Sequence, residues 1–115
     1  MLSKIKNIIS FEDFDLIDLR IGTIISVNSF ENIKKSAYQL LINFDSLGKL
    51  KSSAQIKDLY SSEELIGKQI IAVVNIGERN IGGFISECLV LGISNENGVS
   101  LLKPELKTTD GIQVV

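Results

Sequence analysis

The chain has 115 residues, which is enough for one hydrophobic core and too few for two domains; 44% of the residues are hydrophobic. It has no histidine, one cysteine and a net charge of −2, from 12 basic and 14 acidic residues. The lack of histidine excludes Ser-His-Asp and Cys-His catalysis and histidine metal sites, and the single cysteine excludes an internal disulfide.

The N-terminal residues lack the long apolar region of a signal peptide, and no apolar run approaches the length of a membrane-spanning helix. Together with the single cysteine, this predicts a cytoplasmic location and no membrane partner. The charge is unevenly distributed, because residues 34–68 carry six Lys against four acids. A local basic patch of this kind can bind nucleic acid, with an affinity that falls as salt rises.

The first predicted element is a short helix over residues 11–16, because Ser10 is a good N-cap and acidic residues favour a first helical turn. The carboxylates of Asp13, Asp15 and Asp18 lack the spacing and the glycine of an EF-hand loop, so a helix start is preferred over a metal site.

A strand is predicted over residues 18–27, which are rich in β-branched side chains, and Gly22 within it suggests a bulge or bend. Residues 29–35 have turn chemistry. Apolar and polar residues then alternate over 38–45, which predicts a half-buried strand.

The most informative predicted strand spans residues 49–56. Successive side chains of a strand point to opposite faces, so two lysines and two neutral hydrogen-bonding side chains share one face, and small or apolar side chains share the other. The polar face holds Lys49, Lys51, Ser53 and Gln55; the opposite face holds Leu50, Ser52, Ala54 and Ile56.

The remaining pattern predicts a small helix and several short strands. In chain order these are a helix with Ser61 or Ser62 as N-cap and Gly67 as its end, a buried strand at 68–74, a glycine-rich loop at 75–84, a strand at 85–93, a hairpin turn at 95–98 and a short strand at 99–102. Five or six short strands, with one helix between the third and the fourth, is the order of a small barrel of the OB type. We therefore predict an all-β fold: a five-stranded Greek-key OB-fold barrel with a short N-terminal helix and a C-terminal extension.

Several ordered blocks of the sequence resemble the tRNA-binding domain family, which includes free-standing tRNA-binding proteins and modules of some methionyl- and tyrosyl-tRNA synthetases. The opening Phe11-Glu12-Asp13-Phe14, followed by Asp18-Leu19-Arg20-Ile21-Gly22-Thr23-Ile24, carries this resemblance, and so does Ala72-Val73-Val74-Asn75. The block Lys51-Ser52-Ser53-Ala54-Gln55-Ile56 is more similar to the CsaA branch, described as a protein-export chaperone, than to the synthetase modules.

The resemblance implies an OB-fold homodimer that binds the folded outside of tRNA by shape. CsaA-like members are also credited with binding unfolded preproteins and the export ATPase. The candidate RNA contacts implied for this chain are Lys35, Lys51, Ser52, Ser53, Gln55, Asn75, Arg79, Ser86 and Glu87, to which the strand pattern adds Lys49. Glu78 departs from the family pattern, because related proteins usually carry prolines or a cation before the arginine.

Each candidate contact has a structural alternative. Lys49 and Lys51 could be solubility charges, and Asn75 could satisfy the backbone of its own loop. Arg79 could pair with Glu78 or with Glu87, and Glu87 could orient Arg79 or a ribose hydroxyl. Cys88 is expected to be a small buried hydrophobe.

Apolar residues at both ends of the chain are candidates for a dimer interface. They lie in an N-terminal arm (1–10) and a C-terminal extension (103–115), and the alternative for the arm is a frayed terminus. These residues are Ile5, Ile8 and Ile9, which have helical spacing, and Ile112, Val114 and Val115.

We therefore expect residues 1–115 to form one domain that binds tRNA or tRNA-like RNA as a homodimer. We expect no enzyme activity, because no acid–base pair is evident in the sequence, and neither a cofactor nor a metal. The alternative function is that of a protein-export chaperone that binds unfolded preproteins, with an export ATPase as a possible partner.

Overall fold

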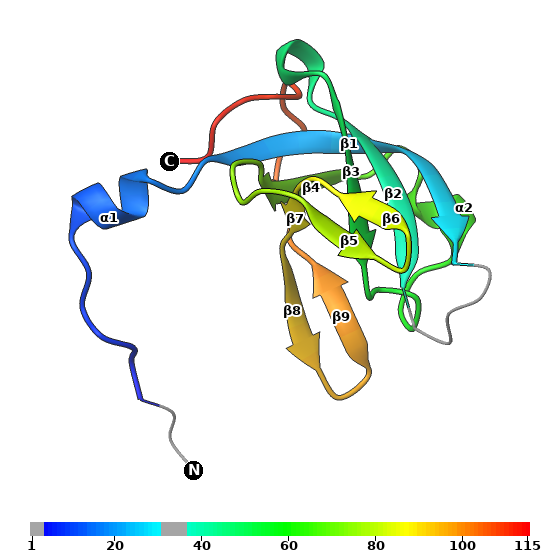
Figure 1. Ribbon diagram of the computed structural model, residues 1–115, viewed down its shortest axis with the longest axis horizontal. Coiled ribbons are helices and arrows are strands. Elements are labelled where there is room, and N and C mark those ends of the chain that lie inside the picture. The colour runs from blue at the N-terminus through cyan, green and yellow to red at the C-terminus, as the bar shows by residue number, and fades with distance from the viewer. Residues whose placement is uncertain (1–3, 31–36) are drawn as a thin grey trace.

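The computed structural model describes residues 4–30 and 37–115, and it is built mainly from short strands (Figure 1). Candidate Lys35 lies outside the described residues. The elements are α1 (Phe11–Asp15), β1 (Leu19–Ser29), β2 (Tyr38–Asn43), the 3-10 turn η1 (Asp45–Leu47), β3 (Lys49–Ala54), α2 (Ser62–Leu65), β4 (Gln69–Val73), β5 (Arg79–Ile81), β6 (Phe84–Ser86), β7 (Leu89–Val90), β8 (Gly92–Asn95) and β9 (Gly98–Leu101). No helix in the described ranges is long and apolar enough to cross a membrane.

Five of the strands form one antiparallel sheet in the order β3-β2-β1-β4-β7. The sheet curls until its two ends meet, because the chain between β6 and β7 hydrogen-bonds to β3: the Glu87 N–H donates to Lys51 O at 2.7 Å, and the Ser52 hydroxyl donates to Cys88 O at 3.1 Å. Helix α2 lies between β3 and β4, as predicted. The predicted OB-like, all-β barrel with minor helix is confirmed.

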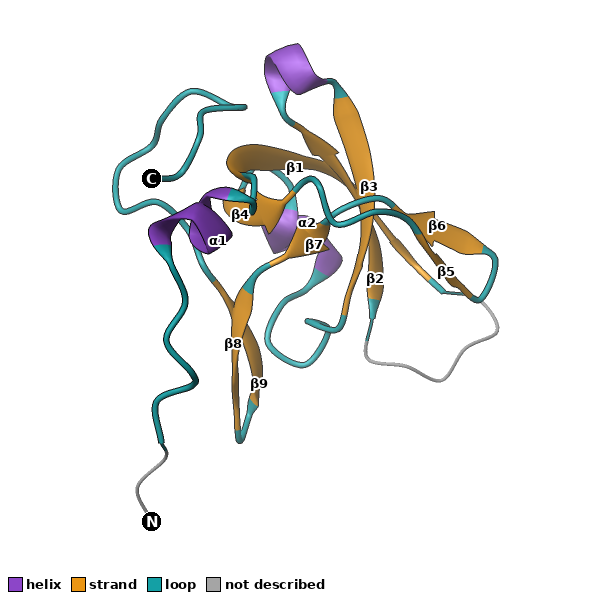
Figure 2. Ribbon diagram, turned by 60° about the vertical axis from the view of Figure 1, so that its left-hand side comes forward, coloured by secondary structure: helices purple, strands orange, loops and turns teal. Residues whose placement is uncertain are grey.

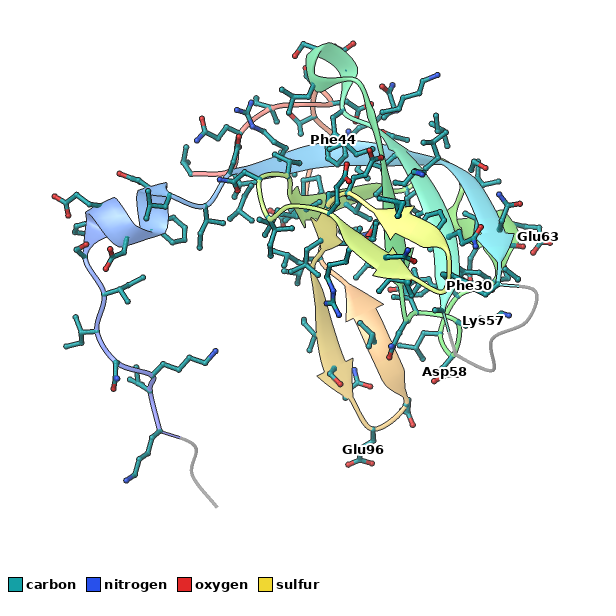
Figure 3. All side chains as sticks on the ribbon, in the orientation of Figure 1. Phe30, Phe44, Lys57, Asp58, Glu63 and Glu96 are labelled. Carbon is teal, nitrogen blue, oxygen red and sulfur yellow. The ribbon has the colours of Figure 1, made fainter. Side chains whose placement is uncertain are left out.

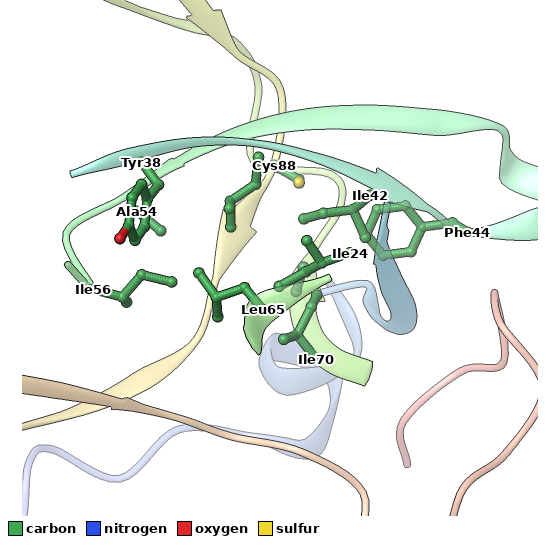
Figure 4. Packing of buried hydrophobic residues seen from close by; sticks show 11 residues of the cluster. Ile24, Tyr38, Ile42, Phe44, Ala54, Ile56, Leu65, Ile70 and Cys88 are labelled. Carbon is green, nitrogen blue, oxygen red and sulfur yellow. The ribbon is translucent and has the colours of Figure 1, made fainter. Parts of the chain in front are cut away.

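The barrel interior is filled by side chains from alternating positions of the strands (Figure 4). In β2, Tyr38, Leu40 and Ile42 point inward while the residues between them are half-buried, as period-two alternation requires. Leu65 of α2 is fully buried against these side chains. Helix α2 therefore covers one opening of the barrel.

Both helices begin where the sequence places an N-cap. The hydroxyl of Ser10 accepts from the Asp13 N–H at 3.0 Å, and Ser61 accepts from the Glu64 N–H at 3.3 Å. Each acid returns a hydrogen bond to the cap backbone, so both starts are capping boxes.

Three sequence predictions need correction. Gly22 is not a bulge: it pairs regularly with Ile70, and β1 shifts register between Ile24 and Ser26 instead. A glycine stands at position 22 because an added Cβ would lie 2.7 Å from the Phe44 ring. This position is therefore limited by close packing.

The predicted loop 75–84 contains half of a hairpin, because β5 and β6 pair around Gly82 and Gly83. The predicted strand 85–93 is divided into β6, β7 and the start of β8. The reason is that its backbone changes partners: Glu87 bonds to β3, and the Leu91 N–H donates to Ile71 O of β4 at 2.9 Å. Residues 85–93 therefore pair in turn with four partners, which are β5, β3, β4 and β9.

The two ends of the chain leave the barrel on the same side of the molecule (Figure 1). Residues 4–10 form no helix despite the spacing of their isoleucines, and they run away from the barrel as an arm. The C-terminal extension is fixed to the first half of β1, since Gly111 donates to Ile21 O at 2.7 Å and Val114 donates to Leu19 O at 2.8 Å. The β8–β9 hairpin also projects from the barrel as a separate ribbon (Figure 2).

Candidate nucleic-acid interface

The outer face of β3 carries the polar residues that the sequence predicted for it. Lys49 and Gln55 are exposed and Lys51 and Ser53 half-buried, while Ser52 and Ala54 are buried on the inner face. The neighbouring strands extend this surface, because Ser53 pairs with Gln39 and Gln39 pairs with Asn28. The result is a polar outer surface that crosses three strands.

The β5–β6 hairpin lies against this surface and positions Lys51. The ammonium group of Lys51 stands 5.3 Å from the centre of the Phe84 ring, and Phe84 contacts Phe30 edge to face at 5.7 Å between ring centres. Figure 3 shows Phe30 beside this hairpin. A cation held over an aromatic face has fewer rotamers to lose on binding a phosphate.

A hollow of about 240 Å³ lies between the outer face of β3 and the β5–β6 hairpin. Its polar lining includes Ser53, Gln55 and Arg79; its apolar lining is formed by Ile76, Ile81 and Leu89. A second hollow, of about 210 Å³, is lined by Asn28, Gln39, Lys51 and Phe84 among others. Each hollow therefore has one cation in its lining, and no carboxylate among the described residues lines either of them.

Arg79 is exposed at the start of β5. The sequence left open an ion pair of Arg79 with Glu78 or Glu87, but within the described ranges the only ion pair is Arg20–Asp18, at 2.6 Å. Hydrogen bonding to Asp18 raises the pKa of Arg20, which remains charged. The Arg79 guanidinium therefore has no carboxylate partner among the residues that the structure describes, and its exposed position allows it to bind an anion.

Two residues predicted to contact RNA, Ser86 and Glu87, instead form hydrogen bonds to the backbone of β3. The Lys51 N–H donates to the Glu87 carboxylate at 2.9 Å, and the Ser53 N–H donates to the Ser86 hydroxyl at 3.1 Å. Ser86 is buried, and Arg79 is its partner across the β5–β6 hairpin. Ser86 and Glu87 thus connect Arg79 to the backbone that carries Lys51.

The predicted RNA contact at Ser52 needs correction, because the side chain of Ser52 does not lie on the outer surface. It is fully buried, and its hydroxyl donates to Cys88 O inside the barrel. The alternation of β3 places it on the face opposite Lys51. The resemblance implied a contact at Ser52 that the strand geometry does not allow.

Asn75 bonds to backbone groups, which was the structural alternative to an RNA contact. These groups belong to residues far away in the sequence and not to its own loop. Its side-chain oxygen accepts from the Asp18 N–H at 2.9 Å, and its amide donates to Leu16 O at 2.7 Å. It therefore fastens the segment between α1 and β1 to the end of β4. Both of its polar groups are already used.

Cys88 is buried, as expected, and lies in the wall of the larger hollow. Burial raises the pKa of the Cys88 thiol to about 12, so it is protonated at neutral pH and is a poor nucleophile.

Sequence analysis missed Asn28, Gln39 and Phe84, which share the outer surface with Lys51. Gln39 lies on a predicted strand and Asn28 directly follows one, but only the strand register shows that they are cross-strand neighbours. Phe84 was assigned to a loop, and its position over Lys51 depends on the hairpin that was not predicted. The alternating pattern of β2 was the one available signal for Gln39.

The six terminal residues predicted for a dimer interface all lie outside the barrel core. Ile5 and Ile8 are 97% and 98% exposed, and Val115 is fully exposed. Ile9 and Ile112 are also exposed, and Val114 is half-buried. A further hollow, of about 290 Å³, is lined by Ile9, Ser10, Phe11 and Phe14 where the arm joins α1.

The chain is similar to members of one family over most of its length. Residues 19–113 match the family described as "Putative tRNA binding domain". The methionine–tRNA ligase of Methanococcoides burtonii is 37% identical over 110 residues, and that of Chlorobium limicola is 33% identical over 111 residues. Each alignment covers 92% of this chain but only 16% and 15%, respectively, of the ligase, so the chain spans about one sixth of the length of these relatives.

Two solved structures are similar along their whole length. CsaA from Picrophilus torridus is 44% identical with a TM-score of 0.88, and chaperone CsaA from Bacillus anthracis is 42% identical with a TM-score of 0.86. The matches cover 94% and 95% of this chain and 100% of each CsaA chain. A protein from Pyrococcus horikoshii related to methionyl-tRNA synthetase has the same fold, with a TM-score of 0.85 at 22% identity. The chain therefore belongs to the tRNA-binding domain family and is similar within it to CsaA.

Proposed function

We propose that this chain is a non-catalytic module that binds tRNA or tRNA-like RNA through the outer surface of β3 and the β5–β6 hairpin. The observation that carries the proposal is that Lys51 and Arg79 line two adjoining hollows whose described lining contains no carboxylate. Lysine neutralises a phosphate as a point charge, and arginine can bind one in a bidentate fashion. Lys49, Ser53 and Gln55 lie on the same face and would contact the RNA backbone.

A net charge of −2 on the whole chain does not oppose local binding, because Lys49, Lys51 and Arg79 lie at the proposed surface and no carboxylate in the described ranges lines its two hollows. At physiological salt, charges more than about 8 Å apart are largely screened from one another. The phosphate beside Lys51 is therefore affected mainly by this surface and only weakly by the acids of α1.

We propose further that two copies of the chain associate through the arm and the C-terminal extension. The support is that Ile5, Ile8 and Phe11 are each at least 88% exposed on one segment, and burying such side chains against a second copy stabilises a dimer by about 25 cal/mol per Å². Two copies of a surface with few cations would then bind one RNA with avidity. Light scattering on the intact protein, and on an Ile5→Ser/Ile8→Ser variant, measures this association.

The same apolar residues favour a second candidate function, the capture of unfolded preproteins. Three observations support it. The hollow beside β3 has an apolar side, the N-terminal arm is exposed, and the two similar CsaA structures are of proteins described as chaperones. A role with an export ATPase in the cytoplasm remains a prediction of the sequence. Salt separates the two functions, because RNA binding weakens steeply as salt rises whereas apolar peptide capture does not.

The deciding experiment is a titration with bulk tRNA, and in parallel with an unfolded preprotein, at low and high salt. Lys51→Ala/Arg79→Ala should abolish tRNA retention while the dimer persists. Each lost phosphate contact should also reduce the slope of log affinity against log salt by about 0.7–0.9. Lys57→Ala/Lys103→Ala is the matched control, because it removes the same charge from two exposed lysines outside both hollows. Equal tRNA binding by the two double variants would refute the assigned site.

A further inference from the structure

The hollow of about 240 Å³ between β3 and the β5–β6 hairpin is poorly suited to a phosphate alone. Arg79 is the one cation in its described lining, and Ile76, Ile81 and Leu89 form much of the rest. A phosphate pushed among these side chains would lose water without enough donors to replace it. The lysines that suit phosphate lie beside the hollow, on β3, rather than within it.

The hollow is also poorly suited to a purely apolar side chain. The side chains of Ser53, Gln55 and Arg79 make no hydrogen bond to any described residue, although each of them lines it. An apolar occupant would cover these groups and leave them without partners, which is costly when they lose water. The occupant that fits has apolar faces and a polar edge.

A nucleobase has this combination. Its faces can pack on aliphatic side chains or on a guanidinium plane, and its edge can bond to an amide and a hydroxyl. The volume of about 240 Å³ lies below the range of drug-sized sites and suits a single small ring system. A base inside a helix cannot reach such a hollow, so the base must be unpaired.

We propose that the hollow between β3 and the β5–β6 hairpin binds one unpaired nucleobase of the RNA, stacked against Arg79 and hydrogen-bonded by Gln55 and Ser53. The phosphates on either side of that nucleotide then lie toward Lys51 and Lys49, which continue along the same face of β3. This inference rests on the proposed RNA-binding function, and it adds a base contact to recognition by shape. It predicts that the preferred RNA contains an unpaired nucleotide at the contact point.

The test compares two blunt-ended RNA duplexes that differ only in one unpaired uridine bulged from the stem. The wild-type protein should bind the RNA with the unpaired base about tenfold more tightly, the effect of one stacked base. Gln55→Leu should lose this preference, because it removes the edge contact at an exposed position. Asn97→Leu is the matched control: it removes an exposed amide from the β8–β9 turn and should keep the preference.

A second measurement on the unaltered protein locates the base directly. With 4-thiouridine at the unpaired position, irradiation should cross-link the RNA to the peptides that contain residues 53–55 or 76–89, and a cross-link confined to residues outside both peptides would overturn the inference. Equal affinity for the two RNAs, with binding still dependent on Lys51 and Arg79, would reject the base pocket and retain the RNA-binding surface. Binding of neither RNA would reject both. Cross-linking of a benzophenone-labelled unfolded peptide to 76–89, in place of the thiouridine, would assign the hollow to peptides and overturn the inference.

Discussion

Glu87 could stabilise the proposed site through its hydrogen bonds to Lys51, or it could contact RNA directly, and substitutions of Glu87 distinguish these two roles. Its backbone N–H donates to Lys51 O at 2.7 Å, and its carboxylate accepts from the Lys51 N–H at 2.9 Å. Both residues are half-buried. Glu87→Ala keeps the first hydrogen bond, removes the second and leaves the Lys51 N–H without its acceptor.

The expected loss follows from the kind of bond. A hydrogen bond to a charged acceptor stabilises by about 1.5–3 kcal/mol, and partial access of water places this one near the lower end. A loss of about 1.5 kcal/mol lowers the melting temperature of a chain of this size by about 5–9 °C. Glu87→Gln keeps an acceptor oxygen at roughly half the strength, so it should lose about half as much stability.

Urea unfolding followed by circular dichroism measures the stability, and hydrogen exchange of the Lys51 amide reports the bond itself. Glu96→Ala is the control, because Glu96 is exposed in the β8–β9 turn (Figure 3) and its loss should change stability by less than about 0.5 kcal/mol. The variants also separate the two roles in RNA binding: Glu87→Ala should weaken it by loosening Lys51, whereas Glu87→Gln removes a negative charge and should bind as well as wild type or better. The reasoning fails if Glu87→Ala unfolds at the wild-type urea concentration with no faster exchange at Lys51.

Three further predictions test other parts of the structure. Glu78→Lys should tighten tRNA binding at low salt and lose this gain at high salt, because it reverses the charge beside Arg79; an unchanged affinity would place RNA away from β5. Gly22→Ala should destabilise the barrel by about 1–3 kcal/mol in chemical unfolding, since the added Cβ would lie 2.7 Å from the Phe44 ring, and a neutral result would show that the ring can move. Because burial raises the folded pKa of the Cys88 thiol from its ordinary value of 9.0 to about 12, the unfolded state loses this proton first, and the free energy of unfolding of wild type should fall relative to Cys88→Ala as pH rises from about 9 to 12. Equal pH dependence of these two proteins would contradict the burial of the thiol.

Local rules predicted the elements whose pattern is complete within a few residues. The alternation in 38–43 and 49–54 gave β2, β3 and the polar outer face, and the serines before acidic residues gave both helix starts. The number and order of these elements were then enough to indicate an OB-type barrel. These signals depend on side-chain period and capping, which act over one or two turns of chain.

What could not be predicted depends on partners far along the chain. Asn75 bonds to Leu16, 59 positions away, and Glu87 bonds to Lys51, 36 positions away. The strand alternation placed Ser52 on the face opposite Lys51, and only the family resemblance implied an RNA contact there; the acceptor of its hydroxyl, Cys88 O, lies 36 positions away. The glycine pair within the predicted loop 75–84 is the turn of the β5–β6 hairpin. The sequence pattern therefore predicted the polar outer face of β3, but not that Asn75, Ser86 and Glu87 bond to distant backbone groups.

The protonated, buried thiol of Cys88 has a practical consequence for every binding assay on this protein. A maleimide dye reacts with thiolates, so a cysteine introduced at an exposed position would label in preference to Cys88. The β8–β9 turn suits this purpose, because it lies at the tip of a hairpin that projects from the barrel, whereas either end of the chain would bring the dye beside the proposed dimer interface (Figure 1). Asn97→Cys would therefore provide one site for a fluorescent dye or for attachment to a surface. This site lies outside the residues of the proposed RNA-binding surface and of the proposed dimer interface.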